Sequence, residues 1–408
     1  MSEGGFNRER AFAILYILAG LGVIFLANLT VEAGSLSTFT DFWVGKNAYQ
    51  FQLPSRLTLY ILGTFCISLG GWGLWRGFRS PGAALVVVGA MLVASFLVWI
   101  TQGKSLNLPS ILQGMLSSAT PLTLGALTGV LCERAAVINI AIEGMMLFGA
   151  FAAVAGFAVT GNPWMGLLSA MGIGGVIATL HAVLSIKYKV DQIVSGTAIN
   201  ILAYAATRYL KITLLGPAGL RTPGTIGSIR IPYLADIPIL GPLIFDNQPT
   251  VYIMLILVVA VNWILFHTPW GLRTRSVGEH PRAADTVGIN VFRVRYFNVI
   301  LGGLIAGIGG AYFSIGEVGA FEDGMTGGKG FVALAAMIFG KWTPIGGFLA
   351  SLLFGFADAV QVKMQILKVP IPPEFLLMTP YLMTIIILAG VVGRAIPPAA
   401  DGKPYEKQ

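Results

Sequence analysis

The sequence predicts an all-α polytopic membrane protein with roughly 10–12 transmembrane helices, each about 20 apolar residues long. Only 11% of the 408 residues are charged and 55% are hydrophobic, whereas soluble domains carry about 25% charged residues. The mean hydropathy is +0.78. The 52 glycines also fit a membrane bundle, because glycine is more frequent in transmembrane helices than in soluble ones.

Apolar stretches long enough to cross about 30 Å of hydrocarbon recur along the chain. We expect spans at 11–29, 57–75, 82–100, 111–131, 139–160, 164–186, 192–209, 251–267, 297–315, 345–361 and 375–393. A further apolar piece at 331–340 is too short to cross alone, so it is predicted to be half of a broken helix.

The orientation of the spans follows from lysine and arginine in short loops, which favour the cytoplasm. Alternation of the spans places four basic sites on one side: Arg8 with Arg10, Arg76 with Arg79, Lys187 with Lys189, and a loop at 271–296 that holds five arginines. The segment 210–250 falls on the opposite side. It is rich in proline and glycine, and irregular backbone is not tolerated against lipid, so it is predicted to be an external loop or cap.

Polar residues inside the spans divide the chain unevenly. Residues 1–101 hold three spans of plain composition, and residues 105–395 hold nearly all the intramembrane polar residues and glycine-rich breaks. We expect an N-terminal extension, a functional core, and a tail at 396–408 that its lysines assign to the cytoplasm.

Several function classes find no support in the sequence. The net charge of +8 is explained by positive cytoplasmic loops, so no nucleic-acid partner is expected. Cys66 and Cys132 form no metal-ligand or disulfide pattern, and neither a metal nor a cofactor is predicted. The nearest match to a phosphate-binding loop, "GMTGGKGF", lacks the first glycine spacing and the hydroxyl after Lys329. No catalytic constellation appears, so the chain is not expected to be an enzyme.

The stretch 129–151, "GVLCERAAVINIAIEGMMLFGAF", is the first of two broken regions. Ionisable groups at membrane depth usually face a bundle interior or a cavity. Glu133 and Arg134 lie either in a cytoplasmic turn or within the bundle. Glu143 either packs against a neighbouring helix end or lines the pathway or its gate. The candidates for the pathway or gate are Glu133, Asn139, Glu143 and Asn200; for Asn200 an interhelical hydrogen bond is the alternative.

The stretch 302–348 is the second broken region, and glycine recurs in it at a spacing that lets helix backbones approach. Glu317, Glu322 and Asp323 follow beside glycines. The sequence "EGMMLFGAFAA" at 143–153 faintly echoes "DGMTGGKGFVALAA" at 323–336. Either the echo is coincidence, or the paired glycine-interrupted segments indicate a midplane binding site, as they do in transporters.

The loop "EHPRAADTVGI" at 279–289 has the pattern of a short capped helix. Pro281 suits the first helical position and Gly288 suits the position after the last. Three small or apolar residues are expected on one face: Ala283, Ala284 and Val287. Arg282, Asp285 and Thr286 share the other face, and the arginines at 293 and 295 are expected to orient the next span. A helix this short is unstable alone, and we therefore expect it to need a docking surface. The alternative is a loop that only sets the topology of the spans.

These residues resemble the coupling loop of ATP-binding-cassette (ABC) importer permeases. The family's E-A-A-x-x-x-G core reads here as 282–288, with arginine in the glutamate position. "ERAAVINIAIEGMMLFGAF", "DQIVSGTAINILA" and "GGLIAGIGGAYFSIG" are similar to stretches of the branched-chain amino acid, ribose and nucleoside permease group, closest to its nucleoside and simple-sugar members. The resemblance covers about 105–395 and leaves out 1–101.

The resemblance implies a multi-pass permease of a prokaryotic plasma (inner) membrane that works by alternating access. It implies three kinds of partner: a cytoplasmic ATP-binding subunit that hydrolyses ATP, a second permease chain, often a non-identical sibling, and an extracellular or lipid-anchored substrate-binding protein. The residues it assigns to ATPase coupling are Arg273, Arg275, Glu279, His280, Arg282, Ala283, Ala284, Asp285 and Gly288. The expected substrates are nucleosides or related simple sugars. The alternative is a secondary transporter driven by an ion gradient, with Glu143 or Asp358 as the ion site.

Overall fold

The structure is a computed structural model, and it describes residues 8–40, 50–78, 80–216, 223–237, 240–369, 372, 374–375, 378 and 395–407. The chain divides into two compact units. The first comprises Met1–Ile111 with Val362–Leu376, and the second comprises Leu112–Gln361 with Leu377–Gln408. Each unit is described by itself.

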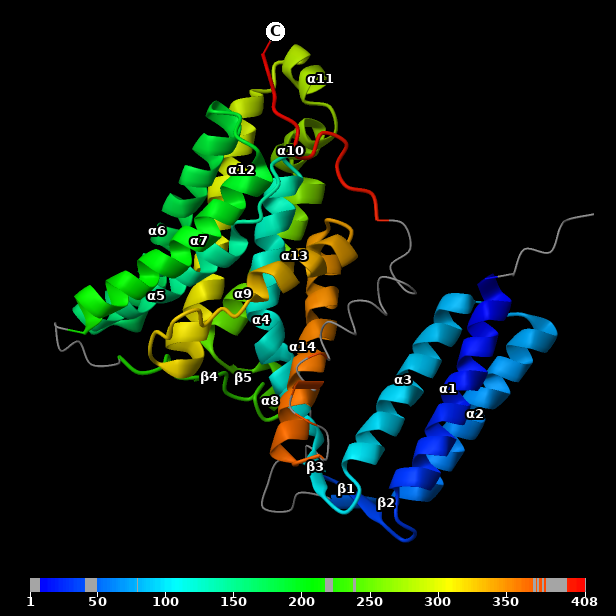
Figure 1. The fold of residues 1–408 in the computed structure, drawn as a ribbon. Helices are drawn as coiled ribbons and strands as arrows, with labels where there is room; N and C mark the ends of the chain where they lie inside the picture. Colours follow the sequence, from blue (N-terminus) through cyan, green and yellow to red (C-terminus); the bar gives the residue numbers. More distant parts are fainter. Residues whose placement is uncertain are drawn as a thin grey trace, which may run out of the picture. The chain divides into compact units, whose positions relative to one another are not determined.

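The first unit contains three long apolar helices, drawn in blue to cyan in Figure 1: α1 (Arg8–Thr30), α2 (Ser55–Arg76) and α3 (Pro81–Ile100). Glycines let α1 and α2 approach closely, since a Cβ atom on Gly63 would lie 2.9 Å from the carbonyl oxygen of Gly20. A small sheet joins the helices. Its central strand β1 (Leu36–Thr40) pairs antiparallel with β2 (Gln50–Pro54) and parallel with β3 (Ser105–Asn107).

The second unit is a helical bundle with two short interruptions of strand. Its long helices are α4 (Leu108–Glu133, from Leu112 onward in this unit), α5 (Ile142–Thr160), α6 (Pro163–Ala182), α7 (Gln192–Leu210), α9 (Pro249–His267), α12 (Val291–Ala311) and α14 (Pro344–Ile366, as far as Gln361). Its short helices are α8 (Leu240–Ile244), α10 (Pro269–Glu279), α11 (Pro281–Thr286) and α13 (Lys329–Phe339). Three helices run on into π-helical stretches: η1 (Val183–Lys187), η2 (Lys211–Leu215) and η3 (Tyr312–Val318). The strands β4 (Ile229–Arg230) and β5 (Asp246–Asn247) pair antiparallel.

Helices α5, α6 and α12 pack closely against one another, and glycines bring their backbones into contact. A Cβ atom on Gly174 of α6 would lie 2.3 Å from the carbonyl oxygen of Gly303 on α12. A Cβ atom on Gly310 would lie 1.9 Å from the carbonyl oxygen of Met146 on α5. The glycines of the second broken region therefore serve close helix packing, as their spacing predicts.

The all-α polytopic fold is confirmed: among the described residues nine helices are long and apolar enough to cross a membrane. The predicted span at 192–209 forms α7, which is 19 residues long but too polar to count among the nine. The stretch 331–340 forms most of α13, which is only 11 residues long, so the prediction that this piece is too short to cross alone is confirmed. The predicted span at 375–393 lies almost entirely outside the described residues.

Candidate functional site

The five-arginine loop folds into the short helices α10 and α11 and the first turns of α12, and α10 and α11 lie at one end of the second unit (Figure 1). Thr268 begins α10, because its hydroxyl accepts a hydrogen bond from the backbone N–H of Gly271 at 3.2 Å. Pro269 and Pro281 occupy the first turns of α10 and α11, where their missing N–H groups cost nothing. The predicted helix over 281–287 is confirmed.

The end of α11 is closed by its own backbone. Gly288 has a φ of 86°, in the left-handed region that glycine adopts without strain. Its N–H donates to the Asp285 carbonyl at 2.9 Å, and the N–H of Ile289 donates to the Ala284 carbonyl at 3.0 Å. These two bonds form a Schellman motif, so the role predicted for Gly288 as the helix stop is confirmed.

The predicted face of Ala283, Ala284 and Val287 is divided in the structure. Ala284 is only 3% exposed and packs with Val277, Val291 and Tyr405 of its own chain. Ala283 is exposed, and Val287 is 75% exposed. Ala284 therefore holds α11 against its own chain, while Ala283 and Val287 face outward.

Most polar residues assigned to coupling surround this outward surface. Arg273, Glu279, His280 and Arg282 are exposed, and Arg275 and Asp285 are half-buried. The Arg275 guanidinium lies 5.2 Å from the centre of the Phe266 ring. A hollow of about 970 Å³ opens between α10, the end of α11 and the start of α12, and its lining includes Arg273, Arg293 and the apolar side chains of Leu272 and Val287. This end of the unit offers cationic and apolar groups together.

Glu143 closes the N-terminus of the half-length helix α13. Its carboxylate accepts three hydrogen bonds: from the Thr326 hydroxyl at 2.5 Å, from the Gly328 N–H at 2.9 Å and from the Gly330 N–H at 2.7 Å. A Cβ atom on Gly330 would lie 2.6 Å from the Glu143 Cα, so this glycine permits the approach. Of the two alternatives for Glu143, packing against a neighbouring helix end describes its geometry.

Two asparagines hold the break between α4 and α5. The Asn200 side chain on α7 accepts from the Gly144 N–H at 2.8 Å and donates to the Ile140 carbonyl at 2.9 Å. Asn139 is fully buried, and its side-chain oxygen accepts from the Ala141 N–H at 3.1 Å. Both side chains use their hydrogen-bonding groups to stabilise irregular backbone at membrane depth, where unsatisfied groups are costly.

The first half of this break is anchored to the turn between α13 and α14. Glu133, the last residue of α4, is 4% exposed and accepts from the Trp342 indole N–H at 2.5 Å. Arg134 donates to the Trp342 carbonyl at 2.9 Å. Burial lowers the pKa of the Arg134 guanidinium, and the charge of Glu279 opposes part of that effect. Glu133 and Arg134 thus share Trp342 as a partner, whereas Glu143 and Asn200 bind other residues.

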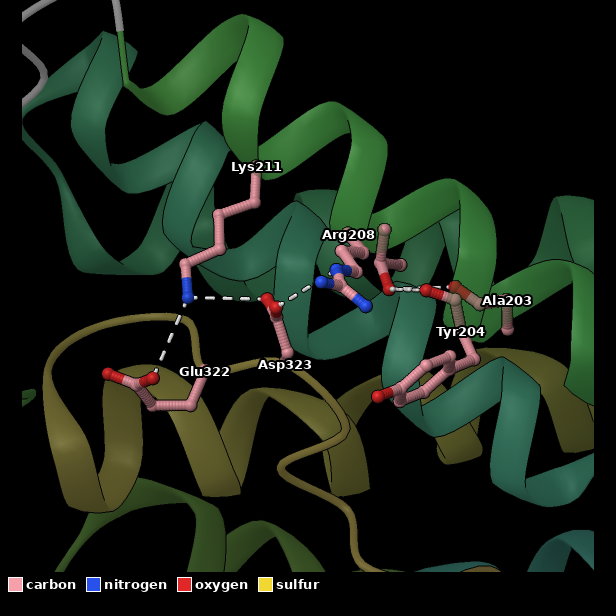
Figure 2. Close-up of polar contacts among 7 residues, drawn as sticks. Ala203, Tyr204, Arg208, Lys211, Glu322 and Asp323 are labelled. Atoms are coloured by element: carbon pink, nitrogen blue, oxygen red, sulfur yellow. Dashed lines mark hydrogen bonds and ion pairs between the residues drawn. The ribbon is translucent and has the colours of Figure 1, made fainter.

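Two ion-pair networks were not predicted from the sequence, which named Asp358 only as the ion site of the alternative secondary transporter. Lys329 at the start of α13 forms an ion pair with Asp358 on α14. Figure 2 shows Arg208 and Lys211 pointing from α7 and η2 toward Glu322 and Asp323; Lys211 Nζ lies 3.2 Å from Asp323 and 3.6 Å from Glu322. The acidic residues beside glycines were a signal for this second network, but nothing local in the sequence indicates their basic partners.

Comparison with known proteins identifies the family of this chain. The family described as "Branched-chain amino acid transport system / permease component" matches residues 111–388. The chain is 44% identical over 299 residues to the guanosine ABC transporter permease protein NupQ of Bacillus subtilis, covering 71% of this chain and 94% of that protein. It is 41% identical over 310 residues to the nucleoside ABC transporter permease protein NupC of Lactococcus lactis, covering 74% and 98%.

A more distant relative is the putative glucose ABC transporter permease protein TsgC13 of Haloferax volcanii, 35% identical over 264 residues that cover 65% of this chain and 80% of that protein. No solved structure matches the chain. The resemblance drawn from the coupling loop is confirmed by the family match. The chain belongs to the permease components of the branched-chain amino acid transport family and is a multi-pass permease subunit of an ABC importer in the plasma membrane.

Proposed function

We propose that the chain forms part of a membrane pathway through which an ATP-driven importer takes up nucleosides. The observation that carries this proposal is the similarity to a guanosine and a nucleoside permease over nearly their whole length, at 44% and 41% identity. The relative named for glucose is less similar, at 35% identity. Nucleosides are therefore favoured over simple sugars.

The end of the second unit formed by α10 and α11 is the proposed contact for the cytoplasmic ATP-binding subunit. Val287, Leu272 and Ala283 present apolar surface there. Arg273, Glu279, His280, Arg282 and Asp285 supply polar contacts at its margin. Apolar anchors inside a polar rim are the usual anatomy of a protein interface, and this arrangement supports docking rather than a loop that only sets topology.

The four polar residues of the broken regions are proposed to position the helices that frame the pathway. Glu143 fixes the start of α13, Asn139 and Asn200 fix the break before α5, and Glu133 fixes the turn after α13. Because their polar groups are engaged within the chain, none is proposed to bind the nucleoside directly. Glu143 is bound by three donors and Asp358 is paired with Lys329, which disfavours either as the site of a driving ion.

The remaining partners and the domain division are also proposals. A second permease chain completes the pathway, and an extracellular or lipid-anchored binding protein delivers the substrate. Residues 1–101 are an extension, 105–395 the permease core and 396–408 a cytoplasmic tail. The start of the family match at residue 111 supports an extension of about this length, and so does the first compact unit, which holds Met1–Ile111 together with Val362–Leu376.

Transport by the reconstituted complex tests the function. Liposomes holding the permease chains and the ATP-binding subunit are given binding protein and radiolabelled guanosine or uridine, with ATP or a non-hydrolysable analogue inside the compartment that the ATP-binding subunit faces. We expect ATP-dependent uptake that an ionophore does not abolish. Uptake by the permease chains alone that collapses with the ion gradient would instead establish the secondary transporter. Uptake of glucose but of neither nucleoside would correct the substrate class.

A further inference from the structure

The C-terminal segment 395–407 is bound along the end of the second unit by its backbone. The Ala400 N–H donates to the carbonyl of Gly278 at 2.9 Å, and the Ala399 N–H donates to the carboxylate of Glu279 at 3.1 Å. Both acceptors belong to the last turn of α10. In Figure 1 the segment, drawn in red, lies beside α10 and α11. The segment is therefore attached to the coupling helices themselves.

Side chains extend this attachment to α11. Tyr405 is 5% exposed and lies in the same apolar cluster as Ala284 of α11 and Val277 of α10. Its ring centre is 5.4 Å from that of Phe292. Since Ala284 is the residue of α11 that turns inward, the tail supplies part of the surface on which α11 rests.

The opposite side of the same segment contacts the break between α4 and α5. Gly402 has a φ of 72°, and a Cβ atom there would lie 2.7 Å from the Cδ1 atom of Ile138. The Asp401 carboxyl group lies beside the carboxyl group of Glu133, close enough for the two to share a hydrogen bond when one of them is protonated. Glu133 also binds the Trp342 indole, so the tail reaches the end of α4 and, through it, the turn after α13.

Arg295 on α12 shows that the tail is an integral part of this end of the fold. Its side chain is 1% exposed, and its Nη1 donates to the Lys403 carbonyl at 3.1 Å. Its other guanidinium groups, Nε and Nη2, have no protein acceptor within the described residues. A buried charge is costly unless it is paired and hydrogen-bonded, and the tail provides the Lys403 carbonyl and the nearby charge of Asp401. Arg295 therefore anchors the tail, where the sequence predicts only an orientation signal.

We propose that residues 395–407 form a transmission element, which carries displacement of α10 and α11 to the ends of α4 and α13. The proposal deepens the proposed function, because it rests on an ATP-binding subunit that moves α10 and α11. A groove of about 520 Å³ is lined by both partners in this contact, with Pro281 and Arg282 on α11 and Lys403, Pro404 and Glu406 on the tail. A subunit seated on α11 therefore also meets the tail.

A segment that only stabilises the fold and a segment that transmits movement predict different results. Loss of a stabilising segment lowers the amount of folded complex, and uptake and ATP hydrolysis fall together. Loss of a transmitting segment leaves the complex assembled and able to hydrolyse ATP, but lowers the number of nucleosides transported for each ATP. The ratio of uptake to hydrolysis is therefore the informative quantity.

Three variants of the complete complex test this in proteoliposomes. Gly402→Val removes the tail from Ile138, Tyr405→Ala removes it from α11, and Lys407→Ala, at an exposed position, is the matched control. For the first two we expect uptake per ATP to fall by about tenfold, within the usual range of coupling free energies between sites. The control should keep the ratio of the unsubstituted complex. An unchanged ratio in both Gly402→Val and Tyr405→Ala would overturn the proposal.

A second readout needs no transported substrate. Spin labels at Lys341→Cys, after α13, and Arg293→Cys, at the start of α12, both exposed positions, report a distance that changes when ATP binds. We expect the Gly402→Val complex to bind the ATP-binding subunit but lose this change. An undiminished change would overturn the transmission role. If the unsubstituted complex shows the change yet takes up no nucleoside, the proposed substrate fails while the transmission test remains valid.

Discussion

The carboxylate of Glu143 on α5 accepts a hydrogen bond from the backbone N–H of Gly330 on α13 at 2.7 Å, across 187 residues of sequence. Two further donors, Thr326 and Gly328, complete the cap of this half-length helix. An anionic cap at a helix N-terminus is favoured by the helix dipole as well as by the hydrogen bonds. The start of α13 is thus determined by a residue of another broken region.

Replacement of Glu143 should destabilise the permease. In Glu143→Ala the Gly328 and Gly330 N–H groups lose their acceptor, and each unsatisfied buried group costs about 1–3 kcal/mol. Glu143→Gln keeps one acceptor oxygen and should be intermediate. The measurement is thermal unfolding of the purified complex in detergent. Equal melting temperatures for Glu143→Ala and the unsubstituted chain would contradict the capping role.

Gly330→Ala should be more disruptive than its size suggests. Its Cβ atom would meet backbone atoms of Glu143 at 2.6 Å, and backbone cannot move aside as a flexible side chain can. Gly172→Ala on α6 is the control, because a Cβ atom there meets nothing within 4 Å and alanine favours helix by about 1 kcal/mol. We expect Gly330→Ala to lower expression and melting temperature and Gly172→Ala to leave both unchanged or raised. A lower melting temperature for Gly172→Ala than for Gly330→Ala would contradict the close contact between Gly330 and Glu143.

The two sides of α11 should respond differently to a charge. Val287→Asp places a carboxylate on outward surface and should weaken retention of the ATP-binding subunit while the permease stays folded. Ala284→Asp places one in the cluster with Val277 and Tyr405, at a cost of several kcal/mol, and should destabilise the permease itself. Co-purification and thermal unfolding separate these effects. Full retention of the subunit by Val287→Asp would remove Val287 from the proposed interface.

Gly288→Val should impair coupling through backbone strain. No atom lies within 4 Å of the position a Cβ would take, but the φ of 86° is strongly unfavourable for a β-branched residue. Gly288→Asn is the matched control, since asparagine tolerates the left-handed region. We expect reduced uptake and reduced stimulated ATP hydrolysis for valine, with membrane insertion intact, and near-normal activity for asparagine. Normal activity of the valine variant would refute a role for the capped end of α11.

The contact between the C-terminal segment 395–407 and the end of α10 should weaken as the pH rises to about 6. Burial raises the pKa of Asp401 from 3.8 to about 6, and the hydrogen bond with Glu133, the backbone N–H of Gly402 and the charge of Arg295 on α12 oppose part of this rise. A folded-state pKa above the unfolded value means that protonation favours the folded contact. Its contribution is complete below about pH 4 and is lost by about pH 6.

Asp401→Asn should remove this dependence and leave the tail bound at pH 7 as firmly as the unsubstituted tail is at pH 4. Protection of the Ala400 amide from hydrogen exchange, corrected for the intrinsic rate at each pH, measures the contact. Protection of the unsubstituted chain that is constant from pH 4 to pH 7 would contradict the assignment.

Sequence patterns predicted the features that depend on local chemistry. Span lengths, the half-length helix near 331–340 and the caps at Pro281 and Gly288 follow from neighbouring residues, so all could be anticipated. The partners of Glu143 lie 183–187 residues away, and the sequence could only offer two alternatives for it. The inward turn of Ala284 depends on Tyr405, which only the folded tail brings near. Long-range contacts of single side chains have no periodic signal along the chain.

The glycine contacts among α5, α6 and α12 have a mechanical consequence. Where Gly174 meets Gly303 and Gly310 meets Met146, main chain touches main chain, and no side-chain rotamer is available to absorb a shift between the helices. Sliding one helix past another would open a void that nothing nearby could fill. We therefore expect these three helices to move as one rigid body, and the rearrangements of a transport cycle to occur in the parts joined by side chains, such as α13 with its Glu143 cap and α11 with its tail.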